Sequence, residues 1–284
     1  MKINITLLIF IILYSCRKET VVPSEFNFNN NIHSDLPSSW KSEFHIIMDN
    51  LYKNIPVEPN DYFFELDIYA WENTSNKPYK SQIGDASGAS ISGNEKKKYM
   101  VLEIPTLEFE DSSMHRYSVI PHEYFHVYQM SLSKNFYEGN IELKWLAEGG
   151  AASFESIYMQ QYYAYNYFKN DQNQVNIAVS NNPKIFKNYD DSYDEDINYS
   201  SSVFMVLALS KELQKLDHSE QTAFRMIFKD FWLQNPTNSN WKTKFEKVFS
   251  INVQDFYESL SDYSTDINSV LPSEYVIIED IFNN

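Results

Sequence analysis

The chain has 284 residues, of which 43% are hydrophobic and 22% charged, a composition typical of a folded globular protein. Its length fits one large domain or two smaller ones. Acidic residues outnumber lysines and arginines by 39 to 23, giving a formal charge of -16. This charge argues against nucleic acid as a partner, because phosphate backbones bind clustered cations. A single cysteine excludes both an intramolecular disulfide and a cysteine-rich zinc module.

The first residues have the pattern of an export signal. Lys2 gives a positive start, and the 12 residues 3–14 are mostly apolar, too few for a transmembrane helix of about 20. The Leu-Tyr-Ser-Cys sequence at 13–16 resembles a bacterial lipobox, whose cysteine is lipidated. We therefore predict a lipoprotein signal peptide over residues 1–15 and lipid attachment at Cys16. The alternative is an ordinary signal peptide with an incidental cysteine.

The segment after Cys16 has the composition of a linker. Residues 17–39 are polar, rich in asparagine and without periodicity. We predict a flexible tether over residues 16–39, followed by one domain over 40–284. The protein is then expected to be exported and held by its lipid at a membrane, on the periplasmic face or at the cell surface.

Patterns along the domain predict its elements. An amphipathic helix comes first, because Trp40, Phe44, Ile47 and Leu51 recur at spacings of three and four. Strands are predicted over 62–71 and 99–104, where aromatic and β-branched residues gather, with a short strand at 89–91 between them. From residue 111 the pattern is helical, with helices predicted over 114–133, 141–169, 200–216, 219–233, 241–249 and 253–262.

These elements predict an α+β fold. A small sheet with one helix, over about 40–110, is expected to pack against a larger helical part, over about 111–284. The strand at 99–104 is expected to be either an ordinary sheet strand or the sheet edge to which an extended peptide adds by backbone hydrogen bonds.

One short motif indicates chemistry. His122, Glu123 and His126 form an H-E-x-x-H sequence on a predicted helix. Residues four apart share one face of a helix, so both imidazoles can point at one metal ion. Glu123 lies about 100° further round, where it can take a proton from a water molecule beside the metal.

Zinc needs a third protein ligand, and two known patterns for it are absent. The metzincin pattern requires a glycine and a further histidine after the second histidine, but Gln129 and Leu132 occupy those positions. The inverted H-x-x-E-H order does not occur either. The remaining pattern has a glutamate on a second helix, and Glu148 follows His126 by 22 residues across a segment that can turn.

The H-E-x-x-H motif followed by W-x-x-E-G-x-A at 145–151 resembles the gluzincin, or peptidase-MA-like, zinc metallopeptidases. The resemblance covers about 30 residues, from Pro121 to Ala151. It implies a zincin-like fold with an active-site cleft between the sheet and the helical part. It also implies one Zn²⁺ per chain, held by His122, His126 and Glu148, with Glu123 as the general base in the hydrolysis of a peptide or protein substrate.

The sequence departs from this family after the third ligand. Many gluzincins have an aspartate or asparagine there that orients a ligating histidine, whereas this chain has Ala151 and Ala152. Glu155, two helical turns beyond Glu148, is the nearest carboxylate that could replace it.

Family enzymes stabilise the oxyanion with a downstream tyrosine or histidine. Tyr199 is the first candidate and His115 the second, although Tyr199 could equally be a packing residue. The aminopeptidase segment G-x-M-E-N is missing, which favours an endopeptidase. The alternative function is non-enzymatic: a surface lipoprotein that binds zinc or a partner on a catalytically decayed scaffold.

Overall fold

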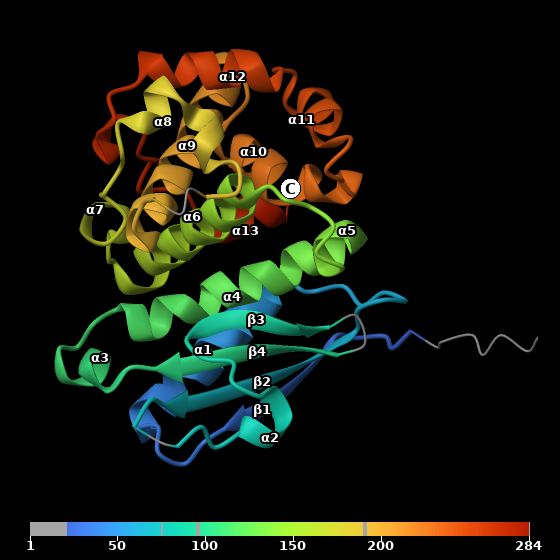
Figure 1. Ribbon diagram of the computed structural model, residues 1–284, viewed down its shortest axis with the longest axis vertical. Coiled ribbons are helices and arrows are strands. Elements are labelled where there is room, and N and C mark those ends of the chain that lie inside the picture. The colour runs from blue at the N-terminus through green and yellow to red at the C-terminus, as the bar shows by residue number, and fades with distance from the viewer. Residues whose placement is uncertain (1–21, 75, 95–96, 190–191, 284) are drawn as a thin grey trace, which may run out of the picture.

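The computed structural model describes residues 22–74, 76–94, 97–189 and 192–283. A four-stranded sheet forms one side of the molecule and a group of helices the other, with one long helix between them (Figure 1). The strands are β1 (Asn27–Ile32), β2 (Glu65–Glu72), β3 (Ala89–Asn94) and β4 (Lys97–Ile104). The predicted α+β class is therefore confirmed.

The sheet has the order β1-β2-β4-β3, in which β1, β2 and β4 run parallel and β3 runs antiparallel to β4. The prediction that residues 99–104 could form the sheet edge is wrong, because β4 is paired on both sides. Its neighbour β3 is the edge strand. The sequence does not reveal the full length of this strand, because Ser90, Ser92 and Gly93 are typical of a loop.

The predicted tether is also too long. Residues from Asn27 to Ile32 pair in parallel register with β2, with Asn27 opposite Glu65 and Ile32 opposite Ala70. An edge strand is held by backbone hydrogen bonds, which require no hydrophobic alternation. The asparagines of β1 therefore gave this segment the composition of a linker although it forms a strand. Phe26, just before this strand, is 5% exposed and packs against Phe63. The folded domain thus begins well before residue 40.

The sheet packs on both faces, but the main core lies on one of them. In β2, the buried residues Leu66, Ile68 and Ala70 belong to the large core shared with α1 (Ser38–Asn54) and α4 (His115–Leu132). Tyr69 and Trp71 point to the opposite face, where a smaller cluster contacts the segment that contains α2 (Lys80–Ile83). This alternation is the period of two expected of a strand.

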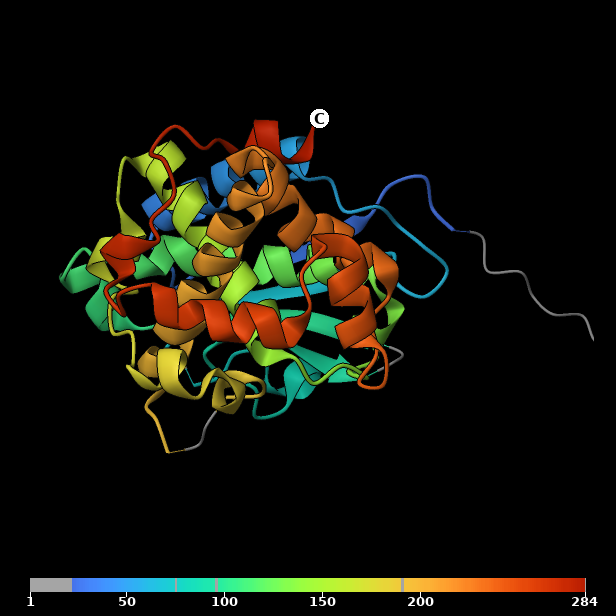
Figure 2. The same ribbon diagram turned by 90° about the horizontal axis from the view of Figure 1, so that it is seen from above.

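Helix α4 lies between the sheet and the helices that follow it in the sequence (Figure 1), and these later helices cover the sheet when the molecule is seen from above (Figure 2). It occupies 115–132 within the predicted 114–133 and continues through Pro121, whose ring lacks the N–H that would bond to the Tyr117 carbonyl. Beyond it pack α6 (Lys144–Tyr163) and α9 (Glu195–Lys215). Shorter helices complete this part: α5 (Lys134–Tyr137), α7 (Tyr167–Asn170), α8 (Ala178–Asn181), α10 (Glu220–Arg225), α11 (Trp241–Phe249), α12 (Val253–Ser259) and α13 (Ile278–Phe282). The short helix α3 (Thr106–Glu110) instead connects β4 to α4.

Within the described segments, no helix combines the length and the apolar character that crossing a bilayer requires.

Candidate metal centre

Helix α4 carries the H-E-x-x-H motif at its middle. His122 and His126 project from one face of the helix, one turn apart, and their rings lie 4.9 Å from each other between centroids. Both side chains are nearly buried, with 8% and 7% of their surfaces exposed. Glu123 is equally buried at 5% exposure. The helix period therefore gathers three polar side chains in the interior of the protein.

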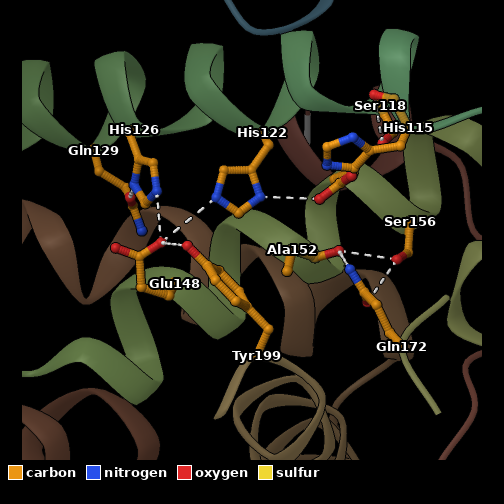
Figure 3. A network of polar contacts seen from close by, with 11 residues as sticks. His115, Ser118, His122, His126, Gln129, Glu148, Ala152, Ser156, Gln172 and Tyr199 are labelled. Carbon is orange, nitrogen blue, oxygen red and sulfur yellow. Dashed lines mark hydrogen bonds and ion pairs between the residues drawn. The ribbon is translucent and has the colours of Figure 1, made fainter. Parts of the chain in front are cut away.

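Helix α6 supplies the third member of the cluster. One carboxylate oxygen of Glu148 (Oε2) lies 3.0 Å from Nε2 of His126 and 3.5 Å from Nε2 of His122. One ligand atom from each of these residues lies within 4.8 Å of the others, so the group could hold a metal ion. Figure 3 shows the two imidazoles pointing from α4 toward Glu148. The structure thus brings together the residues that the two sequence motifs identified.

A close helix contact sets the position of Glu148. The next residue, Gly149, faces the backbone of α9, and a Cβ atom at this position would lie 2.6 Å from the carbonyl oxygen of Ser202. Only glycine allows α6 and α9 to approach so closely here. Gly150 has no such restriction, since its nearest neighbour would be 3.6 Å from an added Cβ. The close approach brings the first turns of α9, which carry Tyr199, next to Glu148.

The other nitrogen of each imidazole is held by a side chain. Nδ1 of His122 lies 2.9 Å from Oε2 of Glu155, so Glu155 makes the contact with a histidine of the motif that its spacing suggested. Nδ1 of His126 lies 2.8 Å from the amide oxygen of Gln129, and the Gln129 amide nitrogen donates to the carbonyl of Ala147. Sequence reasoning missed Gln129, although its place three residues after His126 puts it on the same helix face.

Burial and close charges shift the protonation equilibria of the cluster. Burial disfavours the charged imidazoles, but hydrogen bonds to Glu148 and Glu155 outweigh it and raise the pKa of His122 well above its usual value of 6.5. The charge of Glu148 likewise raises the pKa of His126. Although burial opposes it, the two imidazoles hold the pKa of Glu148 well below its usual 4.5. The metal-free cluster is therefore a buried set of ion pairs.

Glu123 differs from its neighbours. Its oxygen Oε2 is buried and has no hydrogen-bond partner within the described part of the chain. Burial raises the pKa of this carboxyl, against the opposing effect of the two imidazoles. A buried carboxylate without a partner is costly, so its place beside the cluster is consistent with a ligand or water that this oxygen would contact.

The two candidate oxyanion donors are placed differently. Tyr199, in the second turn of α9, directs its hydroxyl at Glu148 Oε2 at 3.4 Å, and its ring lies 5.8 Å from that of His122 (Figure 3). His115 instead pairs with Glu108, with 2.7 Å between Nδ1 and the carboxylate. The structure thus brings Tyr199 to the group formed by His122, His126 and Glu148, while His115 lies on the wall of a cavity beside this group.

This cavity has a volume of about 260 Å³ and opens beside His122 and Glu123. Its wall is made by α4, α6, α7, the first turns of α9 and Ala89 of the edge strand β3. The cavity is a feature that the sequence could not predict, because its lining comes from five separate elements. The predicted lipidation site Cys16 and the signal peptide over 1–15 lie outside the described residues.

Comparison of the chain with protein-family models, with curated proteins and with solved structures finds no match.

Proposed function

We propose that the chain is a zinc-dependent metallopeptidase of the gluzincin type, with a zincin-like fold and its active site between the sheet and the helical part. One observation carries this proposal: two buried histidines and Glu148 meet around one point, with the unpartnered carboxylate of Glu123 beside them. The position of α4 between the two parts of the molecule supports it (Figure 1).

The donor set favours zinc over other biological cations. Two imidazoles and one carboxylate form a common catalytic zinc site, whereas magnesium and calcium prefer oxygen ligands alone. His122, His126 and Glu148 would hold the ion, while Glu155 and Gln129 fix the orientation of the two imidazoles. When bound, zinc supplies Lewis acidity that promotes attack of water on a peptide carbonyl.

The residues of the chain supply the proton transfers. Glu123 takes a proton from the attacking water and passes it to the leaving amine. Tyr199 donates a hydrogen bond to the negative oxygen that develops on the substrate carbonyl. The hydrolysis of a peptide bond then needs no further cofactor.

The decisive experiment is the substitution Glu123→Gln. The variant should retain about one zinc per chain by metal analysis, because Glu123 is not among the three residues that would hold the ion. It should lose the cleavage of denatured proteins and of a peptide library that the wild-type protein shows. Cleavage at the wild-type rate by the variant would contradict this mechanism. A zinc-loaded wild-type protein that cleaves nothing would instead favour the zinc- or partner-binding alternative.

We also propose that Cys16 carries the lipid that holds the exported protein at a membrane, on the strength of the lipobox-like sequence before it. Substitution of Cys16 by serine should move the protein from the membrane fraction to the soluble fraction. Retention of that variant in the membrane fraction would contradict lipid attachment at this residue.

A further inference from the structure

The cavity beside the proposed catalytic centre has an unusual lining. Five of its fourteen lining residues are acidic, against 39 of 284 in the whole chain, and none of the lining residues within the described segments is lysine or arginine. We call it the acidic cavity. Among these acidic residues, Glu123 and Glu155 are buried and lie next to the candidate metal ligands. Asp171, Glu195 and Asp196 are exposed carboxylates.

The three exposed carboxylates come from two elements. Asp171 follows α7, and Glu195 and Asp196 form the first turn of α9. The dipole of α9 favours acidic residues in that turn, whereas Asp171 lies outside this helix, at the end of α7. No lysine or arginine of the described residues forms an ion pair with any of the three. Asp171 does interact with the Tyr165 hydroxyl and with His115.

A second observation shows that the cavity is built to receive something. Glu123 lines it, is 5% exposed, and has one carboxylate oxygen without a partner among the described residues. The side chain that carries this oxygen is therefore reached from the acidic cavity. Its volume, about 260 Å³, is just below the range of about 300–1,000 Å³ for small-molecule sites, which suits one side chain of a larger substrate.

The inner wall suits a long aliphatic stem. Val119 and Ala152 present small apolar surfaces, and the ring of Tyr167 adds an aromatic one. Gln172 is 6% exposed and is fixed by hydrogen bonds to Ser156 and to the Ala152 carbonyl, so that this wall is rigid (Figure 3). The cavity therefore joins a partly apolar inner wall beside Glu123 to exposed negative charges. Lysine and arginine match this arrangement, because they combine a methylene stem with a charged end.

We propose that the acidic cavity binds a lysine or arginine side chain of the substrate, next to the scissile bond, and that Asp171, Glu195 and Asp196 select for it. This inference rests on the proposed peptidase function for its identification of the ligand as a peptide. Among the described lining residues, His115 is the one basic side chain that is not a candidate metal ligand. Its ion pair with Glu108, at 2.7 Å, offsets its charge. Acidic side chains of a substrate are repelled by the same carboxylates.

The test measures binding rather than cleavage, so that it does not depend on hydrolysis. The full-length, zinc-loaded Glu123→Gln variant is titrated with three labelled alanine-serine peptides that differ only at one central residue, which is lysine, methionine or glutamate. We expect the lysine peptide to bind about tenfold more tightly than the methionine peptide, since the ammonium group would pair with the exposed carboxylates. The glutamate peptide should bind most weakly, and high salt should reduce the difference.

Two further variants separate the cavity from the overall negative charge. Neutralising the cavity with Asp171→Asn, Glu195→Gln and Asp196→Asn together should abolish the preference for lysine, and Asp171→Asn alone should reduce it. The matched control Asp262→Asn removes one exposed carboxylate outside the cavity and should leave the preference unchanged. Because all of these side chains are exposed, we expect the variants to fold.

The outcomes distinguish this inference from the proposed function. Equal binding of the lysine and methionine peptides, absent binding, or a preference that survives neutralisation of the cavity overturns the inference. Cleavage by the wild-type protein without any preference for basic residues overturns it too, and leaves the peptidase function standing. Tighter binding of the lysine peptide by a protein that cleaves nothing supports the acidic cavity and overturns the peptidase function.

Discussion

Glu155 lies 2.9 Å from Nδ1 of His122, on the opposite side of the imidazole from Glu148. In the neutral imidazole, this contact places the proton on Nδ1 and leaves Nε2 free to bind a metal ion. The carboxylate that orients the histidine thus comes from seven residues after Glu148. Two turns of α6 therefore present a proposed ligand and its supporting carboxylate on one face.

The first prediction follows from this contact. Glu155→Ala should lower zinc affinity by about 10- to 100-fold, as is usual when the partner of a ligating histidine is removed. Competition with a chromophoric chelator measures the affinity, and urea unfolding of the zinc-free protein controls for loss of the fold. Glu155→Gln keeps a hydrogen-bonding oxygen and should lose less. Zinc affinity equal to that of the wild type in both variants would show that Glu155 does not support the site.

The second prediction compares two adjacent glycines. Gly149→Ala should destabilise the protein by about 1–3 kcal/mol, because the new methyl group meets the rigid backbone of Ser202. Gly150→Ala has room for its methyl group and should be neutral or stabilise the helix by up to about 1 kcal/mol. Urea unfolding of both variants gives the comparison. Equal free energies of unfolding would show that α6 and α9 can separate at no cost.

A third prediction concerns Tyr199. Substitution by phenylalanine keeps the ring against His122 and removes only the hydroxyl near Glu148. If the hydroxyl stabilises the oxyanion, kcat should fall by about 10²- to 10³-fold with little change in KM or zinc content. Steady-state kinetics on one peptide, with metal analysis, measures this. An unchanged kcat would assign Tyr199 to packing alone.

The fourth prediction concerns pH. In the zinc-free protein, the pKa values of His122 and His126 are raised, so their stabilising effect is complete below the usual value of 6.5 and is lost as pH rises through the raised values. The pKa of Glu148 is lowered, so its contribution is present above the usual 4.5 and is lost as pH falls through the lowered value. The zinc-free protein should therefore lose stability as pH rises above about 6.5.

Zinc reverses this dependence, because histidines must be neutral to bind it and protons are released on binding. The increase in Tm caused by zinc should therefore grow with pH across the same range. Thermal unfolding with zinc or with a chelator, at a series of pH values, provides the measurement. An increase in Tm that does not vary with pH would contradict the ion-paired state of the zinc-free cluster.

The sequence predicted the centre of the candidate site better than its surroundings. Helical spacing was sufficient to place His122, Glu123 and His126, and a second motif was sufficient to identify Glu148 on another helix. Gln129 was within reach of the same spacing argument. The lining of the acidic cavity was not, because Asp171 and Gln172 reach the site only through the packing of short helices whose contacts leave no periodic pattern.

The first strand shows a different limit. Asparagines in β1 suggested a linker, since sequence patterns record side chains and not the backbone pairing that holds an edge strand. The sequence predicts helix α4 almost to its ends, because a long stretch of helix-compatible apolar residues outweighs one proline.

The pairing of β1 with β2 also limits how far the proposed lipoprotein can reach. Phe26, the first buried residue among those described, comes ten positions after Cys16, and a fully extended chain of ten residues spans at most about 36 Å. The tether of 24 residues expected from the sequence would have allowed more than twice that distance. If the chain is the proposed lipid-anchored peptidase, so short a connection would restrict it to substrates that come close to the membrane surface, and membrane proximity would then be part of its substrate selection.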